Sequence, residues 1–135
     1  MTKKQWIQND ANQDKVRDAI TNLTQLSHGL AVEAGWWANP HTGERIERND
    51  GELIALMHSE LSEALEAIRK NLDDDHLPQH KGVTVELADT LVRIFDYCGA
   101  RQLPIGEALA QKLAYNAQRA DHKASARQGE NGKQF

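Results

Sequence analysis

The chain has 135 residues, of which 39% are hydrophobic and 27% are charged, a balance typical of one folded domain and not of a disordered chain. Its formal net charge of −4 argues against a binding surface for a nucleic acid polymer. The single cysteine, Cys98, excludes an intrachain disulfide, and no apolar run reaches the length of about 18 residues that a membrane span needs, so we expect a cytoplasmic protein.

The first half of the sequence predicts two segments without regular structure and one helix between them. The first dozen residues are polar and are expected to form a flexible arm. Apolar residues then recur at helical spacing from Val16 to Leu30 and predict a helix that ends at Gly35. Residues 36–50 have no period and contain proline and glycine, so they are expected to form a surface loop.

Three further helices follow in the second half. Asn49 or Asp50 is expected to cap a helix that continues to Lys70, and residues 71–82 form a polar connector. A third helix is predicted from Val83 or Thr84 to Gly99, and a fourth from Pro104 to Arg119. Residues 121–135 carry no apolar period and are expected to be flexible.

These elements predict an all-α protein. No segment shows the alternation of a half-buried strand, and no internal repeat is visible. We therefore expect a single domain over residues 1–135, folded as a four-helix bundle. The low aromatic content of 5% and the alanine-rich helix faces favour a homo-oligomer.

The second predicted helix carries two acidic residues where apolar ones are expected. At about 100° per residue, Glu60 falls inside the stripe formed by Leu53 and Leu56, and Glu63 falls on its edge. Burying an unpaired carboxylate costs several kcal/mol even after the surroundings relax. The position of Glu60 therefore calls for a compensating charge.

The third predicted helix repeats this arrangement with Glu86 and Asp89, again three residues apart at the border of the apolar stripe. If the two helices pack antiparallel, four carboxylates converge and raise one another's pKa. A hard divalent cation would relieve the repulsion, and oxygen-only ligands favour Mg²⁺, with Mn²⁺ as a substitute. The competing interpretation is that such acidic pairs are ordinary solvated residues of a helix surface.

The fourth predicted helix supplies cations. Lys112, Asn116 and Arg119 line up on a face that would otherwise be buried. The guanidinium fork of an arginine suits bidentate contact with phosphate oxygens. Alternatively, Lys112 and Arg119 pair with acids of a neighbouring helix or subunit.

Read in order, these segments resemble the all-α nucleotide pyrophosphohydrolases of the MazG-like superfamily. The resemblance covers the chain from about Leu23 onward and rests on four stretches: LSHGLAVEAGWW, HSELSEALEAIRK, ELADTLVRIFDYCG and KLAYNAQR. It implies hydrolysis of a nucleoside triphosphate to the monophosphate and pyrophosphate, by a dimer or tetramer. One departure is that the family pattern opens with two adjacent glutamates, whereas Ser59 stands at the first of these positions here.

The resemblance also implies roles for particular residues. The metal ligands would be Glu60, Glu63, Glu86 and Asp89. Phosphates and sugar would be contacted by Lys112, Asn116 and Arg119, and Trp37 of the aromatic loop is the candidate to stack on the base. For catalysis, Glu63 is our first choice to accept the proton of the attacking water, and Glu60 is the second.

Three other interpretations remain open. A diiron carboxylate bundle would need Glu-x-x-His pairs, but Glu63 and Asp89 stand where the histidines belong. A non-catalytic helical adaptor would use the acids for solubility alone. A relative of the phosphoribosyl-ATP pyrophosphohydrolases would share the metal site, and only a substrate panel would separate it from an enzyme that cleanses the nucleotide pool.

Overall fold

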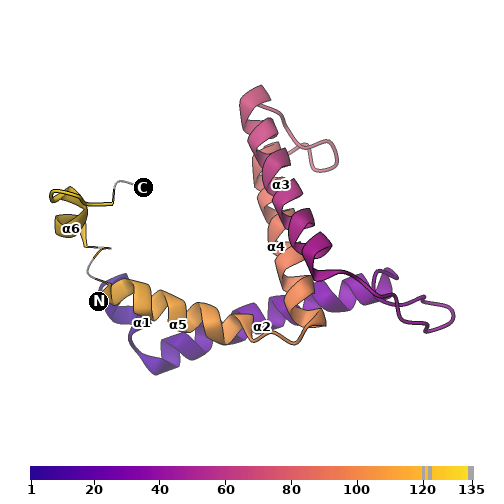
Figure 1. Cartoon of the computed structure of the whole chain (residues 1–135), viewed down its shortest axis with the longest axis horizontal. Helices are drawn as coiled ribbons and strands as arrows, with labels where there is room; N and C mark the ends of the chain where they lie inside the picture. The colour runs from indigo at the N-terminus through magenta and orange to yellow at the C-terminus, as the bar shows by residue number, and fades with distance from the viewer. Residues whose placement is uncertain (120, 122, 134–135) are drawn as a thin grey trace. The chain divides into compact units, whose positions relative to one another are not determined.

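The structure is a computed structural model that describes residues 1–119, 121 and 123–133 (Figure 1). These residues form six α-helices and no strand, so the prediction of an all-α protein is confirmed. Two isolated β-bridges join loop residues, Ala38 with Arg45 and Asp73 with Lys81. None of the described helices combines the length and the apolar character that crossing a membrane would require. The helices are α1 (Lys3–Ile7), α2 (Asp10–Glu33), α3 (Asp50–Lys70), α4 (Gly82–Ala100), α5 (Ile105–Gln118) and α6 (Ala124–Gln128).

The contacts of the chain divide it into two compact units. The first unit comprises Met1–Asn22 and Pro104–Phe135, and the second comprises Leu23–Leu103. The first unit therefore holds the beginning of α2 together with α1, α5 and α6. The second unit holds the end of α2, the following loop, and helices α3 and α4.

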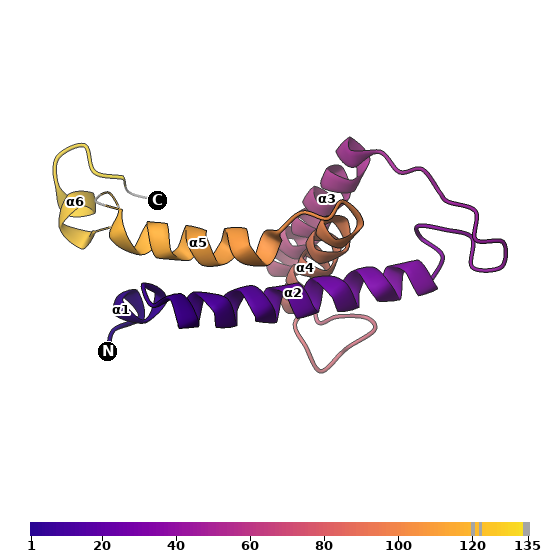
Figure 2. The same cartoon turned by 90° about the horizontal axis from the view of Figure 1, so that it is seen from below.

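In the first unit, α5 lies alongside α1 and the beginning of α2 (Figure 2). Gly106 permits the close approach of α5, because a Cβ atom there would lie 2.5 Å from the backbone oxygen of Arg17. The Gln8 side chain donates a hydrogen bond to the backbone oxygen of Ala114 at 2.9 Å and accepts one from Gln118. Side-chain amides thus hold the amino-terminal segment against α5.

The expected irregular arm at residues 1–12 is helical instead. Thr2 and Gln5 form a reciprocal capping box at the start of α1, in which each side chain accepts a hydrogen bond from the other residue's backbone N–H. Ile7 is buried, which anchors this short helix. The prediction failed because a five-residue helix is too short to show a hydrophobic period.

The expected irregular tail also contains a short helix, α6, over Ala124–Gln128. Lys133 near its end is exposed. Residues 122, 134 and 135 of the predicted flexible tail lie outside the described residues.

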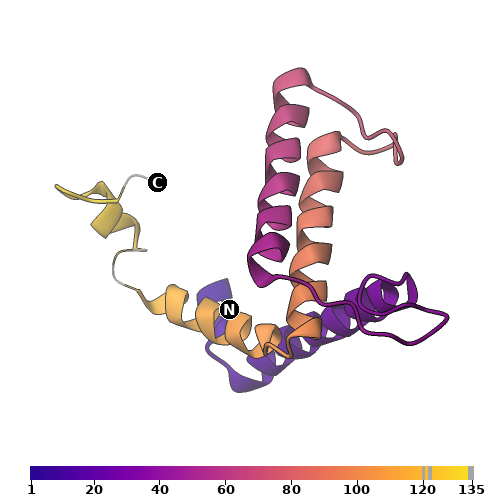
Figure 3. The same ribbon diagram turned by 45° about the vertical axis from the view of Figure 1, so that its right-hand side comes forward.

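In the second unit, α3 and α4 lie side by side and run in opposite directions (Figures 1 and 3). Small residues line their contact: Ala64 and Ala67 are buried, and a Cβ atom at Gly82 would lie 3.0 Å from the Cβ of Ala67. The predicted bounds of α3 are confirmed. Asn49 caps its start by accepting a hydrogen bond from the backbone N–H of Glu52, and Asn71 ends it in the left-handed conformation with φ 50°.

The predicted end of α4 at Gly99 needs a correction, because the helix continues to Ala100. Gly99 does not end the helix but allows α4 to pack closely against α2. A Cβ atom at Gly99 would lie only 2.5 Å from the Cβ of His28 on α2. The glycine therefore lets the end of α2 approach the end of α4.

We predict that Gly99→Ala lowers the free energy of unfolding by about 1–3 kcal/mol, because the added methyl overlaps the Cβ of His28. The matched control is Gly29→Ala, one residue after His28, where an added Cβ has no neighbour within 4 Å. The control should stabilise α2 by about 0.5–1 kcal/mol, since alanine favours a helix interior. Chemical denaturation followed by circular dichroism measures both, and equal effects of the two variants would contradict the close contact.

Candidate metal centre

Glu60 is a charged residue buried at the contact between α3 and α4. Only 7% of its surface is exposed. Its Oε1 accepts a hydrogen bond from Nε of Arg93 on α4, at 2.6 Å. The expectation that Glu60 lies on the inner face of its helix and needs a compensating charge is confirmed, and in this structure the guanidinium of Arg93 supplies that charge.

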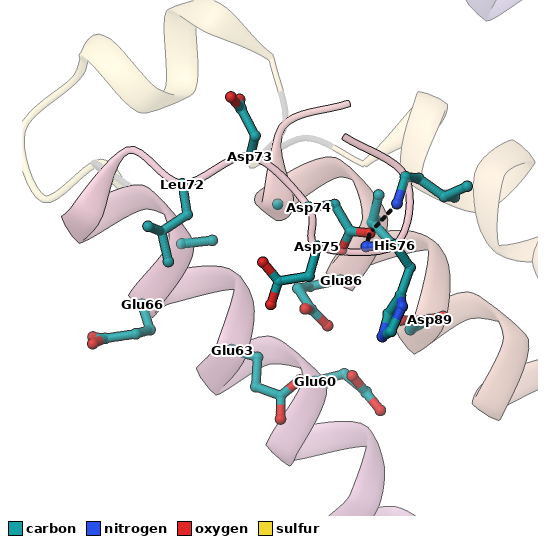
Figure 4. Close-up of a pocket in the computed structure, with 14 residues that line it drawn as sticks. Glu60, Glu63, Glu66, Leu72, Asp73, Asp74, Asp75, His76, Glu86 and Asp89 are labelled. Atoms are coloured by element: carbon teal, nitrogen blue, oxygen red, sulfur yellow. Dashed lines mark hydrogen bonds between the residues drawn. The ribbon is translucent and has the colours of Figure 1, made fainter. Parts of the chain in front are cut away.

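Glu60, Glu63 and Glu86 bring their carboxylates together between the two helices (Figure 4). One oxygen from each of the three lies within 4.8 Å of the others. The helical spacing explains this meeting, because Glu63 stands three residues after Glu60 on α3 and therefore nearly above it. Glu86 reaches the same place from the first turns of α4.

Asp89 lies in the same cleft but not among these three carboxylates. It lines the cleft together with Glu60, Glu63 and Glu86. Of the two acidic residues that α4 contributes, Asp89 is exposed and Glu86 is half-buried. Of the four predicted metal ligands, the structure thus places three close together and the fourth beside them. A ligand role for Asp89 stays a prediction.

Burial and neighbouring carboxylates raise the pKa of both acids that α4 contributes to the cleft, Glu86 and Asp89. Loss of hydration is the main reason that the pKa of Glu86 rises from 4.5 to about 7, and hydrogen bonding to Glu60 and the charge of Glu63 add to it. Burial, followed by the charge of Glu60, also raises the pKa of Asp89, and Arg93 opposes that rise. Near neutral pH the cluster therefore holds a proton that a cation would displace.

The cluster opens into an acidic cleft of about 640 Å³. The connector after α3 also lines the cleft with Asp73, Asp74 and Asp75, of which Asp75 points toward the glutamates and Asp73 away from them (Figure 4). Asp73 pairs with Lys81 at 2.8 Å, and Asp74 accepts hydrogen bonds from the backbone N–H groups of two following residues. The sequence analysis treated this run of aspartates as a connector only, although three successive acids before a helix were a usable signal.

The donor set fits a hard divalent cation. All three clustered side chains offer oxygen, which is the ligand type that Mg²⁺ and Mn²⁺ prefer. On one octahedral Mg²⁺, adjacent ligand oxygens lie about 3 Å apart and opposite ones about 4.2 Å apart, so the three carboxylates, whose oxygens lie within 4.8 Å, would need to draw together around the ion. Among the described residues, Arg93 is the cation that ion-pairs with the cluster, which leaves excess negative charge for a bound ion.

Arg93 is the residue that the sequence analysis missed. It follows Asp89 by four positions, a spacing that brings both side chains to one face of α4. That spacing was the available signal, but an acid and a base four residues apart on a helix are most often a surface pair. The long-range partner Glu60 becomes visible only when α3 and α4 are placed together.

A second cleft, of about 810 Å³, adjoins the acidic one within the same unit. Glu60 and Asp89 line both clefts, and the second is bounded by leucines of α2 and by Trp36, which is 62% exposed. Its apolar walls contrast with the acidic floor that the two clefts share. A ligand lying across both would meet charge at one end and hydrocarbon at the other.

Trp37, the predicted base-stacking residue, is held by polar contacts. Its Nε1 donates a hydrogen bond to Oδ1 of Asp96 at 2.8 Å, and Nδ1 of His28 lies 2.9 Å from the same oxygen. The guanidinium groups of Arg48 and Arg101 lie 5.0 and 5.5 Å from its ring centroids. The neighbouring Trp36 has the freer ring, and stacking of a base on Trp37 stays a prediction.

The predicted phosphate-binding residues lie on or next to α5, in the first unit. Lys112 is exposed, with Nζ 5.1 Å from the ring centroid of Tyr115. Arg119 caps the end of α5 and forms an ion pair with Asp121. Oδ1 of Asn116 is buried without a hydrogen-bond partner among the described residues. Contact of these three side chains with phosphate stays a prediction.

Comparison of the chain with protein-family models, with curated proteins and with solved structures gave no match. The interpretation of the site therefore depends on its own geometry and chemistry.

We predict that the protein without divalent cations loses stability as pH rises from about 4.5 to about 7. Because the folded state raises the pKa of Glu86, it holds this proton more tightly than the unfolded chain does, and the resulting stabilisation disappears on deprotonation. Urea denaturation in EDTA across this pH range measures the effect. Glu86→Gln should remove most of the fall, while Glu33→Gln at the exposed end of α2 should retain it; parallel curves for all three proteins would refute the prediction.

We also predict that Arg93→Met destabilises the cation-free protein by about 1–3 kcal/mol, because it leaves Glu60 buried without its partner. Mg²⁺ should restore part of this loss, so the Mg²⁺-linked rise in melting temperature should be larger in Arg93→Met than in the wild type. Arg69→Met, at an exposed position of α3, is the control and should change neither quantity. An Mg²⁺ effect of the same size in all three proteins would show that the cation does not compensate Glu60.

Proposed function

We propose that the protein is an Mg²⁺-dependent hydrolase that cleaves a nucleoside triphosphate to the monophosphate and pyrophosphate. The observation that supports this best is the cluster of Glu60, Glu63 and Glu86, with one carboxylate buried and another at a pKa of about 7. Such a cluster is destabilising without a cation. Carboxylate-bound Mg²⁺ commonly also binds the phosphates of a substrate, which makes a nucleoside triphosphate a suitable ligand. The resemblance of the sequence to MazG-like enzymes supports the same reaction.

The carboxylates would serve two roles, metal binding and proton transfer. Glu60, Glu63 and Glu86 would hold Mg²⁺, and Asp89 would complete the site from the side. When bound, Mg²⁺ supplies positive charge that offsets the triphosphate and makes water a better nucleophile. Mn²⁺ has similar ligand preferences and would substitute.

Glu63 is the proposed general base. It is the exposed member of the cluster, so its carboxylate can meet a water molecule at the mouth of the acidic cleft. The water oxygen attacks the α-phosphorus, the bond from this phosphorus to the bridging oxygen breaks, and pyrophosphate leaves. Glu63 takes the proton of the attacking water, and Glu60 is the alternative acceptor.

Positive groups would stabilise the leaving pyrophosphate. Lys112, Asn116 and Arg119 are the proposed contacts to phosphates and sugar; Lys112 and Arg119 would act through charge, Arg119 also through its planar fork, and Asn116 through hydrogen bonds of its amide. Trp37 is the proposed aromatic contact for the base. Canonical and modified deoxynucleotides are the first substrates to test, in keeping with a role in cleansing the nucleotide pool.

The main alternative is a non-catalytic helical adaptor. Its acids would be solvated, and it would show neither an Mg²⁺-linked thermal shift nor release of pyrophosphate from any nucleotide. A second alternative is an enzyme like the phosphoribosyl-ATP pyrophosphohydrolases, which would share the metal site but not the substrates. Pyrophosphate release measured across dNTPs, NTPs, damaged analogues and phosphoribosyl-ATP, with and without Mg²⁺, separates the three.

We predict that Glu60→Gln and Asp89→Asn each abolish pyrophosphate release, by at least about 100-fold, while the protein stays folded. The fold should survive because each change removes one negative charge from a repelling cluster. Glu52→Gln, on the first turn of α3 and outside the acidic cleft, is the matched control and should keep the wild-type rate. Wild-type turnover in either site variant, with helicity confirmed by circular dichroism, would disprove the assigned metal site.

A further inference from the structure

The loop between α2 and α3, residues 34–49, is closed by its own hydrogen bonds; we call it the aromatic loop. The backbone N–H of Ile46 donates to the backbone oxygen of Trp37 at 3.0 Å, and the N–H of Asn39 donates to the oxygen of Glu44 at 2.8 Å. Because these bonds hold the loop together, its position depends on the contacts that join it to the helices.

Asp96 on α4 makes the contact at the beginning of the aromatic loop. Its Oδ1 accepts a hydrogen bond from Nε1 of Trp37 at 2.8 Å, and Nδ1 of His28 on α2 lies 2.9 Å from the same oxygen. Only 15% of the Asp96 side chain is exposed, and burying a carboxylate is costly unless it is hydrogen-bonded. The two contacts offset this cost, so the carboxylate stabilises the arrangement in which the Trp37 ring stays beside it.

A second contact holds the end of the aromatic loop. Nη2 of Arg101, the residue that follows α4, donates a hydrogen bond to the backbone oxygen of Arg48 at 2.8 Å. Nε of Arg101 also donates to Asp50, the first residue of α3, at 2.7 Å. The guanidinium of Arg101 lies 5.5 Å from the centroid of the Trp37 ring. The contacts at both ends of the loop therefore lie near the carboxyl-terminal end of α4.

These contacts determine which groups the aromatic loop presents to the apolar cleft of about 810 Å³. Trp36 and Arg48 come from the loop and line this cleft, and Asp96 lines it as well. The guanidinium of Arg48 lies 5.8 Å from the centroid of the Trp36 ring. Within the part of the chain that the structure describes, Arg48 forms no ion pair with a carboxylate, so its charge is available to an anionic ligand.

We propose that Asp96 is a positioning residue, which fixes the aromatic loop along the apolar cleft through its hydrogen bond with Trp37. The proposal rests on the proposed function, because this cleft shares Glu60 with the carboxylate cluster and receives the part of the nucleotide that extends away from the metal. A loop that is already held in place loses less freedom when the ligand binds. Asp96 therefore lowers KM for the nucleotide and leaves the chemical step unchanged.

The first measurement is trypsin digestion of the folded full chain without nucleotide or metal. Cleavage after Arg48 requires its backbone oxygen to leave Arg101, so the cleavage rate reports on the loop. Asp96→Leu removes the acceptor and should raise this rate by about 10-fold or more, with no change in cleavage after Arg69 on α3. Asp96→Asn keeps an oxygen that accepts from the indole and should stay within about threefold of the wild type.

The second measurement is the steady-state kinetics of pyrophosphate release with Mg²⁺. Asp96→Leu should raise KM by about 10-fold or more while kcat stays within about twofold of the wild type, and Asp96→Asn should restore most of the loss. The control is Cys98→Ala, which truncates a buried side chain two positions further along α4 and leaves the hydrogen bonds of Asp96 in place. It lowers stability but should change neither KM nor the cleavage rate after Arg48.

Equal cleavage of the wild type and Asp96→Leu after Arg48 would overturn the proposal, as would a loosened loop that lowers kcat and leaves KM unchanged. Should Asp96→Leu fail to fold, Trp37→Phe replaces it in the digestion, because it removes the donor and keeps an aromatic ring. Cleavage of that variant at the wild-type rate would likewise refute the proposal. A wild type that releases no pyrophosphate refutes the proposed function alone, since the digestion still decides whether Asp96 fixes the loop.

Discussion

The repulsion among carboxylates at the contact between α3 and α4 is the constraint on which the second unit depends. Glu60 is buried there and lies within a few ångströms of Glu63 and Glu86, an arrangement that is destabilising unless the negative charge is compensated. Arg93 offsets one of these charges, and a raised pKa on Glu86 offsets another. Neither compensation is complete near neutral pH, so the cluster retains negative charge.

Small residues make the constraint possible. Ala64, Ala67 and Gly82 are buried between the helices and let the two backbones approach, so that side chains from both reach a common point. Larger residues at these positions would separate the helices and let each glutamate turn to solvent. The α3–α4 pair therefore carries both a cluster of carboxylates and a set of exposed aliphatic side chains.

The sequence was sufficient for those features that depend on the position of a residue within its own helix. Helical periodicity placed Glu60 on the buried side of α3, and the bounds of α3 followed from the cap at Asn49 or Asp50 and from the apolar period that continues to Lys70. Features that depend on contact between distant segments could not be read in this way. The pairing of Arg93 with Glu60 and the close approach of Gly99 to His28 each require two helices to be placed together.

The pairing of Arg93 with Glu60 also explains how the cluster can be buried without a cation. A carboxylate buried in the folded state needs a positive partner, and the Arg93 guanidinium on α4 provides one. If the proposed cation binds Glu60, it would take over this role with a larger charge. Arg93 lines the apolar cleft and pairs with Glu60, which lines both clefts, so this ion pair links the two.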